Sequence, residues 1–144
     1  MSSANDHQIL ENQLCFPLYA ASRLVTRLYQ PLLEQCKLTY TQYIVLMILW
    51  QDDGLSVKQI GEKALLNSNT LTPLLKRMQQ AQLLERIKNK SDERQVDIKL
   101  TPKGWQLKQE LACIPQQLIN QTDYDTVKAK QLKILLEQLI KQLK

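Results

Sequence analysis

The 144-residue sequence has few of the residues that enzyme sites most often use. It contains one histidine, His7, in a polar N-terminal segment, so histidine-based catalysis is not expected. Its three glycines form no phosphate-binding loop, and no paired-carboxylate motif is present. The chain is therefore not expected to be an enzyme.

Cysteine is also scarce. Cys15, Cys36 and Cys113 are an odd number, lie far apart and form no CxxC pair, which argues against a secreted disulfide scaffold. Zinc sites need clustered cysteine and histidine ligands, and a single histidine cannot supply them. No metal and no cofactor are expected.

Long apolar runs are absent as well. No stretch approaches the roughly 18 apolar residues that a membrane span needs. The first residues lack the basic start and apolar stretch of a secretory signal. The sequence therefore predicts a cytoplasmic location without membrane association.

Positive charge gathers in the middle of the chain. The formal net charge is +5, and residues 67–103 alone carry eight basic and four acidic side chains, a net charge of +4. Residues 1–66 have a net charge of −1. A basic segment is the electrostatic footprint of a surface that meets phosphates, although most basic stretches are only solvated faces.

Helical spacing of apolar residues runs through the N-terminal part of the chain. It predicts a first helix with Cys15 at or just before its start and Pro17 in its first turn, or else a bend at Pro17. Pro31 is expected to interrupt this helix. Residues 43–50 are almost all apolar and predict a buried helix.

Capping signals divide the middle of the chain. Thr39 with Gln42 and Ser56 with Gln59 are capping-box pairs, each ahead of an apolar run. Polar residues then lead into a helix over 68–80 with one apolar face. Two short helices joined by a polar turn predict a helix-turn-helix.

The periodicity then changes to that of strands. Residues 84–88 and 95–100 alternate apolar and polar, and the charged segment 89–94 lies between them. This predicts a β-hairpin with a long basic tip directly after the helix-turn-helix.

The C-terminal part is predicted to be helical again. Thr101 and Pro102 are a cap and a first-turn proline, Pro115 is expected to break or bend the helix, and residues 127–143 form a last helix. The last helix has too much apolar surface to stay exposed, and with the first helix it predicts a dimerisation surface.

The predicted fold class is mainly α with a small β-hairpin: a winged helix-turn-helix plus N- and C-terminal dimerisation helices. We expect a single domain over residues 1–144. Its winged helix-turn-helix would cover about 38–103, and its dimerisation helices about 8–35 and 104–144.

Residues 10–115 resemble the MarR family of winged-helix transcription regulators. The local pattern is SDER at 91–94, VDIKL at 96–100 and TPKG at 101–104. The resemblance implies a homodimer that binds double-stranded DNA at a palindromic operator.

A narrower resemblance is to the organic-hydroperoxide-sensing branch of that family. In that branch a cysteine at the position of Cys15 is the peroxide sensor, and tyrosines at the positions of Tyr29 and Tyr40 hydrogen-bond it. Cys113 matches the second cysteine of a two-cysteine subgroup. The matching segments are NQLCF at 12–16, LY at 18–19, Tyr29, PLL at 31–33, LTY at 38–40, QY at 42–43 and LTP at 71–73.

The resemblance implies that Cys15 reacts with peroxide. Thiols attack peroxides as thiolates, and both a helix N-terminus and phenol donors favour the anion. Oxidation would give a sulfenic acid, which condenses with a second thiol, here Cys113 of the other subunit. The disulfide would rotate the winged parts away from successive major grooves, about 34 Å apart. This predicts a repressor that leaves its operator when organic hydroperoxide oxidises Cys15.

For DNA, the helix over 68–80 is expected in the major groove. Arg94 would reach the minor groove, as the matching arginine does in the family, with Asp92 positioned to orient it. The candidate DNA-binding residues are Ser68, Asn69, Thr70, Thr72, Lys76, Arg77, Lys88, Lys90, Asp92 and Arg94.

Other interpretations remain open. The chain could be a MarR-type regulator that senses a small aromatic acid in the dimer cleft, with Cys15 incidental, or, more remotely, a thiol peroxidase. Tyr29 and Tyr40 could be core edges, and an inert Cys113 would leave a small cellular thiol to cap the sulfenic acid. Cys36 is interpreted as structural, with no evident partner.

Overall fold

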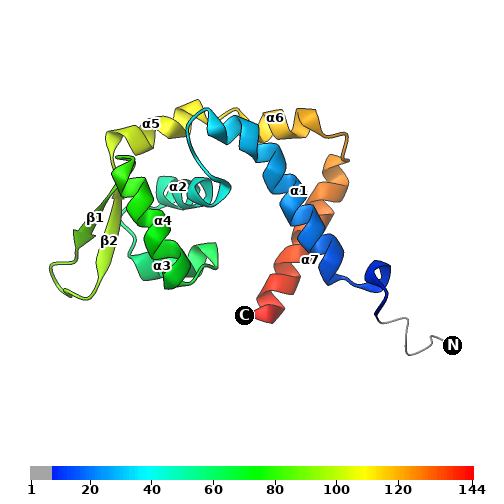
Figure 1. Ribbon diagram of the computed structural model, residues 1–144, viewed down its shortest axis with the longest axis horizontal. Helices are drawn as coiled ribbons and strands as arrows, with labels where there is room; N and C mark the ends of the chain where they lie inside the picture. The colour runs from blue at the N-terminus through cyan, green and yellow to red at the C-terminus, as the bar shows by residue number, and fades with distance from the viewer. Residues whose placement is uncertain (1–7) are drawn as a thin grey trace. The chain divides into compact units, whose positions relative to one another are not determined.

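The computed structural model describes residues 8–144, and His7 lies outside the described residues (Figure 1). The predicted class, mainly α with a small β-hairpin, is confirmed. The elements are η2 (Leu10–Asn12), α1 (Cys15–Glu34), α2 (Tyr40–Gln51), α3 (Val57–Ala64), α4 (Ser68–Gln80), β1 (Leu84–Lys88), β2 (Val96–Leu100), α5 (Pro102–Glu110), α6 (Ile114–Gln121) and α7 (Thr126–Leu143).

The chain divides into two compact units. The first extends to Ala112 and contains every element from η2 to α5, including the predicted helix-turn-helix and hairpin. The second, Cys113–Lys144, consists of α6 and α7. Among residues 8–144, no helix combines the length and the apolar character that crossing a bilayer requires.

The predicted helix starts are confirmed. Thr39 and Ser56 each form a complete capping box with the glutamine three residues later. Thr101 accepts a hydrogen bond from the N–H of Gly104, and Pro102 lies in the first turn of α5. These caps satisfy backbone N–H groups that the helices leave unpaired at their starts, so short sequence signals decide where helices begin.

The hairpin is tied to the helices through backbone groups. β1 and β2 pair antiparallel, with Leu84 opposite Leu100. The N–H of Ile98 donates to the carbonyl of Leu55 at 2.8 Å, and Ser56 forms an isolated β-bridge with Asp97, so the segment before α3 is bound to β2. The N–H of Leu100 donates to the Asp53 carboxylate at 2.9 Å. The base of the hairpin is thus fixed to the segment between α2 and α3.

The core of the first unit is aliphatic. It is built from residues of α2, α3, α4 and the hairpin that share one property, an exposure of 1% or less: Val45, Leu46, Leu49, Ile60, Leu71, Leu75, Met78, Leu84 and Ile98. Burying each such side chain contributes about 1.5–3 kcal/mol, which makes the helix-turn-helix and hairpin one cooperative body.

Two predictions about local structure were wrong. Pro31 does not interrupt the first helix, because α1 continues through it to Glu34. The missing N–H costs one helical bond, but Leu33 beyond it is buried to 1% exposure, and the Gln30 amide donates to Glu34 across it at 2.8 Å. In β1 the alternation fails, because Ile87 is 43% exposed while Arg86 shares the inner face with Leu84.

The close approach of α5 to the loop before β1 requires a glycine. A Cβ on Gly104 would clash with the carbonyl oxygen of Leu83 and lie 3.0 Å from Leu100. The carbonyl of Gly104 accepts the indole N–H of Trp50 at 3.0 Å, which joins α5 to α2. A larger residue would have to push these elements apart.

We therefore expect Gly104→Ala to lower the free energy of unfolding by about 1–3 kcal/mol, despite the better helix propensity of alanine. Urea unfolding followed by circular dichroism measures this. Gln106→Ala, on an exposed position of the same helix, is the matched control and should change stability little. Equal stability of Gly104→Ala and the parent chain would show that α5 has room to shift.

Candidate functional site

Cys15 is the first residue of α1 and its side chain is exposed. Its surroundings along the chain are apolar and also exposed: Leu14 is 67%, Phe16 44% and Tyr19 59% exposed. The first N–H groups of a helix favour negative charge nearby. The structure thus gives Cys15 the predicted position at a helix N-terminus, with access for an apolar reagent.

Tyr29 and Tyr40 lie against each other. Tyr29 is in α1, Tyr40 begins α2, and their ring centroids are 4.8 Å apart. The ring centroid of Tyr43 lies 6.0 Å from that of Tyr29. Burial raises the pKa of Tyr29, with Tyr40 and Tyr43 adding to the rise. The Tyr29 phenol therefore remains protonated at neutral pH and keeps its O–H as a hydrogen-bond donor.

The structure does not bring Cys15 to these phenols within one chain. Cys15 and Tyr29 belong to the same continuous helix, and at 1.5 Å per residue their positions are about 21 Å apart along its axis. A cysteine side chain cannot bridge that distance. The predicted thiol–phenol contact is therefore excluded inside a single subunit.

Cys36 has a partner that the sequence did not reveal. Its thiol donates to the carboxylate of Glu110, 74 positions away, at 3.8 Å. Burial raises the pKa of the Cys36 thiol, and the charge of Glu110 and this hydrogen bond raise it further. A thiol held protonated is a poor nucleophile, so Cys36 suits the structural role predicted for it.

Cys113 occupies the N-cap position of α6 and is exposed. Like Cys15, it is an accessible thiol at the start of a helix. Cys15, Cys36 and Cys113 are all in the thiol form.

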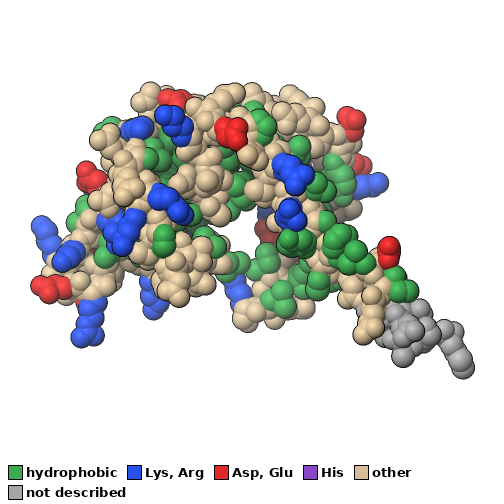
Figure 2. All heavy atoms as spheres, viewed as in Figure 1, with side chains coloured by type: hydrophobic (Ala, Val, Ile, Leu, Met, Phe, Trp, Pro, Cys, Tyr) green, Lys and Arg blue, Asp and Glu red, His purple; other side chains and the backbone are tan. Residues whose placement is uncertain are grey.

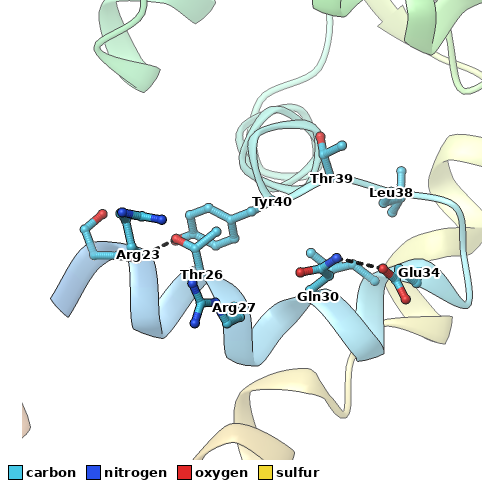
Figure 3. Close-up of a pocket in the computed structure, with 10 residues that line it drawn as sticks. Arg23, Thr26, Arg27, Gln30, Glu34, Leu38, Thr39 and Tyr40 are labelled. Carbon is cyan, nitrogen blue, oxygen red and sulfur yellow. Dashed lines mark hydrogen bonds between the residues drawn. The ribbon is translucent and has the colours of Figure 1, made fainter. Parts of the chain in front are cut away.

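An open hollow of about 520 Å³ lies beside Tyr40 (Figure 3). Side chains from α1 and from the start of α2 line it, including Arg23, Arg27 and Tyr40. Arg23 donates to the Tyr19 hydroxyl at 3.2 Å and lies over that ring. The two arginines outnumber the one carboxylate of the lining, that of Glu34, so the hollow has an excess of positive charge that suits an anion.

The predicted DNA-contact residues of α4 lie on its outer side. Ser68, Asn69, Thr70, Lys76 and Arg77 are exposed and Thr72 is half-buried, whereas Leu71, Leu74, Leu75 and Met78 are buried. Asn67 caps the helix through the N–H of Thr70 at 2.9 Å. In Figure 2, Lys and Arg side chains gather over the hairpin and the neighbouring helices, in agreement with the charge of residues 67–103.

The hairpin tip is ordered by its own side chains. The side-chain amide oxygen (Oδ1) of Asn89 accepts hydrogen bonds from the N–H groups of Ser91 and Asp92, and the Asp92 carboxylate accepts one from the N–H of Arg94 at 3.0 Å. Asp92 thus orients Arg94 through its backbone. The side chains of Lys88, Lys90 and Arg94 are exposed, and none of them forms a salt bridge within residues 8–144. They are therefore accessible to a phosphate backbone.

Sequence reasoning missed two cations at this surface. Lys58 at the start of α3 and Arg86 in β1 line a hollow together with Asp92 and Arg94. The signal that identifies Arg86 is the break in alternation, which puts a charged residue on the inner face of the hairpin.

Comparisons with known proteins agree with this architecture. The family described as transcriptional regulator SarA/Rot matches residues 27–111. The organic hydroperoxide resistance transcriptional regulator of Bacillus subtilis is 45% identical over 143 residues, covering 99% of this chain and 97% of the relative.

Two solved structures of one protein, AbfR, are also similar. Reduced AbfR bound to DNA has a TM-score of 0.80 and 36% identity, and the match covers 97% of both chains. Disulfide-formed AbfR has a TM-score of 0.62 and 37% identity, covering 96% of this chain and 92% of the other. The fold, the family match and the identity over almost the whole length together establish that the chain belongs to the MarR family of winged-helix transcription regulators, within its organic hydroperoxide resistance type.

Proposed function

We propose that this protein is a cytoplasmic, homodimeric repressor that is released from a palindromic DNA operator when organic hydroperoxide oxidises Cys15. The observation that carries the proposal is the arrangement of α1, with an exposed thiol at one end and a pair of contacting phenols at the other. The Bacillus subtilis relative is named for resistance to organic hydroperoxide, which supports the same signal.

The proposed dimer is supported by the apolar surface that one chain leaves uncovered. On α1, Leu24 is 57% and Val25 50% exposed. No residue of α7 is buried, and Leu132, Ile134 and Leu135 are each at least 45% exposed. Exposed apolar surface of this extent marks an interface in a folded protein. A second copy covers it most simply, in line with the dimerisation helices at about 8–35 and 104–144.

A dimer can also bring Cys15 close to phenols, because the partner subunit supplies a second pair of them. If two α1 helices run antiparallel, the N-terminus of one lies near the C-terminal half of the other. Cys15 is then hydrogen-bonded by Tyr29 and Tyr40 of the partner subunit. Each such bond to a charged group is stabilising by about 1.5–3 kcal/mol, which favours the thiolate.

The chemistry then runs in two steps. The Cys15 thiolate attacks the terminal oxygen of the hydroperoxide, the O–O bond breaks, and the alcohol leaves after taking up a proton. The thiol of the partner subunit's Cys113 attacks the resulting sulfenic acid, and water leaves as the disulfide forms. That AbfR has a disulfide-formed structure supports this end state.

Release follows from geometry. A disulfide holds its two Cα atoms within about 4.4–6.8 Å, so its formation forces the helices that carry the cysteines to move. The recognition helices α4 of a dimer must fit successive major grooves about 34 Å apart. A change in their spacing weakens binding while each DNA-contacting part keeps its structure. That AbfR has been solved bound to DNA in reduced form supports DNA as the partner.

The hollow beside Tyr40 favours a second candidate function. Arg23 and Arg27 offer charge-assisted hydrogen bonds to a carboxylate, as a regulator of a small aromatic acid would require. In that case Cys15 is incidental. The first experiment below separates the two candidates.

Cys15→Ser should bind DNA with the affinity of the parent chain but stay bound after addition of cumene hydroperoxide, because no thiolate is available. A DNA mobility shift with and without the peroxide, repeated after a reductant, measures this. Cys36→Ser is the matched control and should be released like the parent chain. Peroxide-driven release of Cys15→Ser would contradict the sensor role, and release by benzoate alone would establish the second candidate.

Cys113→Ser should abolish the reducible covalent dimer, because Cys15 then lacks its resolving thiol. Denaturing, non-reducing electrophoresis after a hydroperoxide pulse measures the dimer band, again with Cys36→Ser as the control. A dimer band that persists in Cys113→Ser and disappears in Cys36→Ser would show that Cys36, and not Cys113, is the resolving cysteine.

Arg94→Ala should weaken operator binding by about 1–3 kcal/mol, because the exposed arginine at the hairpin tip is lost, and should leave the rate of thiol oxidation unchanged. Fluorescence anisotropy at fixed salt measures the affinity, and a thiol titration during oxidation measures the rate. Lys108→Ala, an exposed position of α5, is the control for charge alone. Identical affinities of the Arg94 and Lys108 variants would remove the hairpin tip from the interface.

A further inference from the structure

A second hollow, of about 470 Å³, lies among α3, α4 and the hairpin. Its lining includes Ser56 and Lys58 at the start of α3, Thr72 on α4, and Arg86 and Arg94 of the hairpin. All of these belong to the first compact unit. In Figure 1, β1 and β2 lie beside α4 and α3.

Arg86 is the unusual member of this lining. It lies on the inner face of β1, opposite the fully buried Ile98, where an apolar residue would be expected. Its Nε is shielded from solvent and has no hydrogen-bond partner among the described residues. An external anion cannot reach this shielded Nε, but Arg86 also lines the hollow, so the remainder of its guanidinium is the part that such a ligand can contact.

The charge of the hollow identifies that partner as an anion. Three cationic side chains, Lys58, Arg86 and Arg94, meet one carboxylate, that of Asp92, which already accepts the backbone N–H of Arg94. The N-terminus of α3 adds its own positive end. The planar fork of an arginine matches a phosphate through two parallel hydrogen bonds, and Thr72 adds a hydroxyl.

We propose that this hollow binds one phosphate of the DNA backbone in each half-site, with Arg86 as its principal ligand. The proposal rests on the DNA binding described under the proposed function and adds a contact outside the recognition helix and the hairpin tip. It also explains why the hairpin carries an arginine on its inner face. Arg86 lines the hollow together with Ser56 and Lys58, so its head group lies near the start of α3.

A phosphate contact differs measurably from a base contact. It contributes equally to all DNA sequences, and each neutralised phosphate makes the slope of log K against log salt steeper by about 0.9. A dimer binds two half-sites, so the two Arg86 side chains together should contribute about 1.8 to the slope of log K against log salt. A base contact would instead change which sequences are preferred.

The test uses the full-length dimer and a duplex that the parent chain selects from a random-sequence pool. Arg86→Gln should weaken binding at least about tenfold at 0.1 M salt and reduce the salt slope by about 1.8, with the same loss on base-substituted duplexes. Arg86→Lys keeps the charge and should keep most of the slope. Lys99→Gln removes a charge from the same hairpin but outside the hollow, and should change the slope little.

A second measurement locates the phosphate. Single neutral methylphosphonates are introduced one position at a time in both half-sites. At one position the parent chain should lose about as much affinity as Arg86→Gln loses, and the Arg86→Gln chain should lose nothing more there. Additive losses at every position, or equal salt slopes for Arg86→Gln and Lys99→Gln, would overturn the proposal. Failure of the parent chain to select any duplex would overturn the proposed function with it.

Discussion

The length of α1 is the constraint on which the rest depends. It keeps Cys15 about 21 Å along the axis from Tyr29, so one chain cannot place the phenols on its own thiol. In the proposed mechanism the second subunit completes the site. The interaction that covers the exposed apolar side of α1 is then also the one that activates the thiol. Weakening the dimer interface would therefore weaken sensing before it affected the core of either subunit, which is built mainly from α2, α3, α4 and the hairpin.

The DNA-contacting part is built to move without deforming. The hairpin base is held by Ile98 and Leu100 through backbone N–H groups, and α5 is held to α2 by the indole of Trp50. These bonds are buried or half-buried and join elements that share one aliphatic core. A rearrangement elsewhere would reach DNA as a shift of this whole body. In the proposed mechanism, oxidation therefore acts on the distance between the DNA-contacting parts of two subunits and leaves the shape of each unchanged.

The fold could be predicted wherever the signal was local. The caps at Thr39 and Ser56 and the bounds of the recognition helix were correct, because a few adjacent residues decide them. Pro31 was misread, because burial of Leu33 beyond it outweighs the lost hydrogen bond. The contact of Cys36 with Glu110 was missed, because it joins residues 74 positions apart. The separation of Cys15 from the phenols was contained in the sequence, since it needs only the rise of a helix.

The thiol site and the DNA-binding surface depend on different physical interactions, so one protein can combine them. Burial keeps the Tyr29 phenol protonated, so its capacity to donate to a thiolate is insensitive to pH near neutrality and to salt. In the proposed DNA interface, the cations around Arg86 and Arg94 act on phosphates, and their contribution falls as salt rises. In the proposed mechanism, ionic strength sets how tightly the reduced protein holds DNA, while oxidation sets whether the DNA-contacting parts of the two subunits fit the grooves. Ionic strength changes the affinity for DNA, whereas oxidation changes the spacing of the two DNA-contacting parts. A change in salt alone therefore cannot produce the same effect as the peroxide.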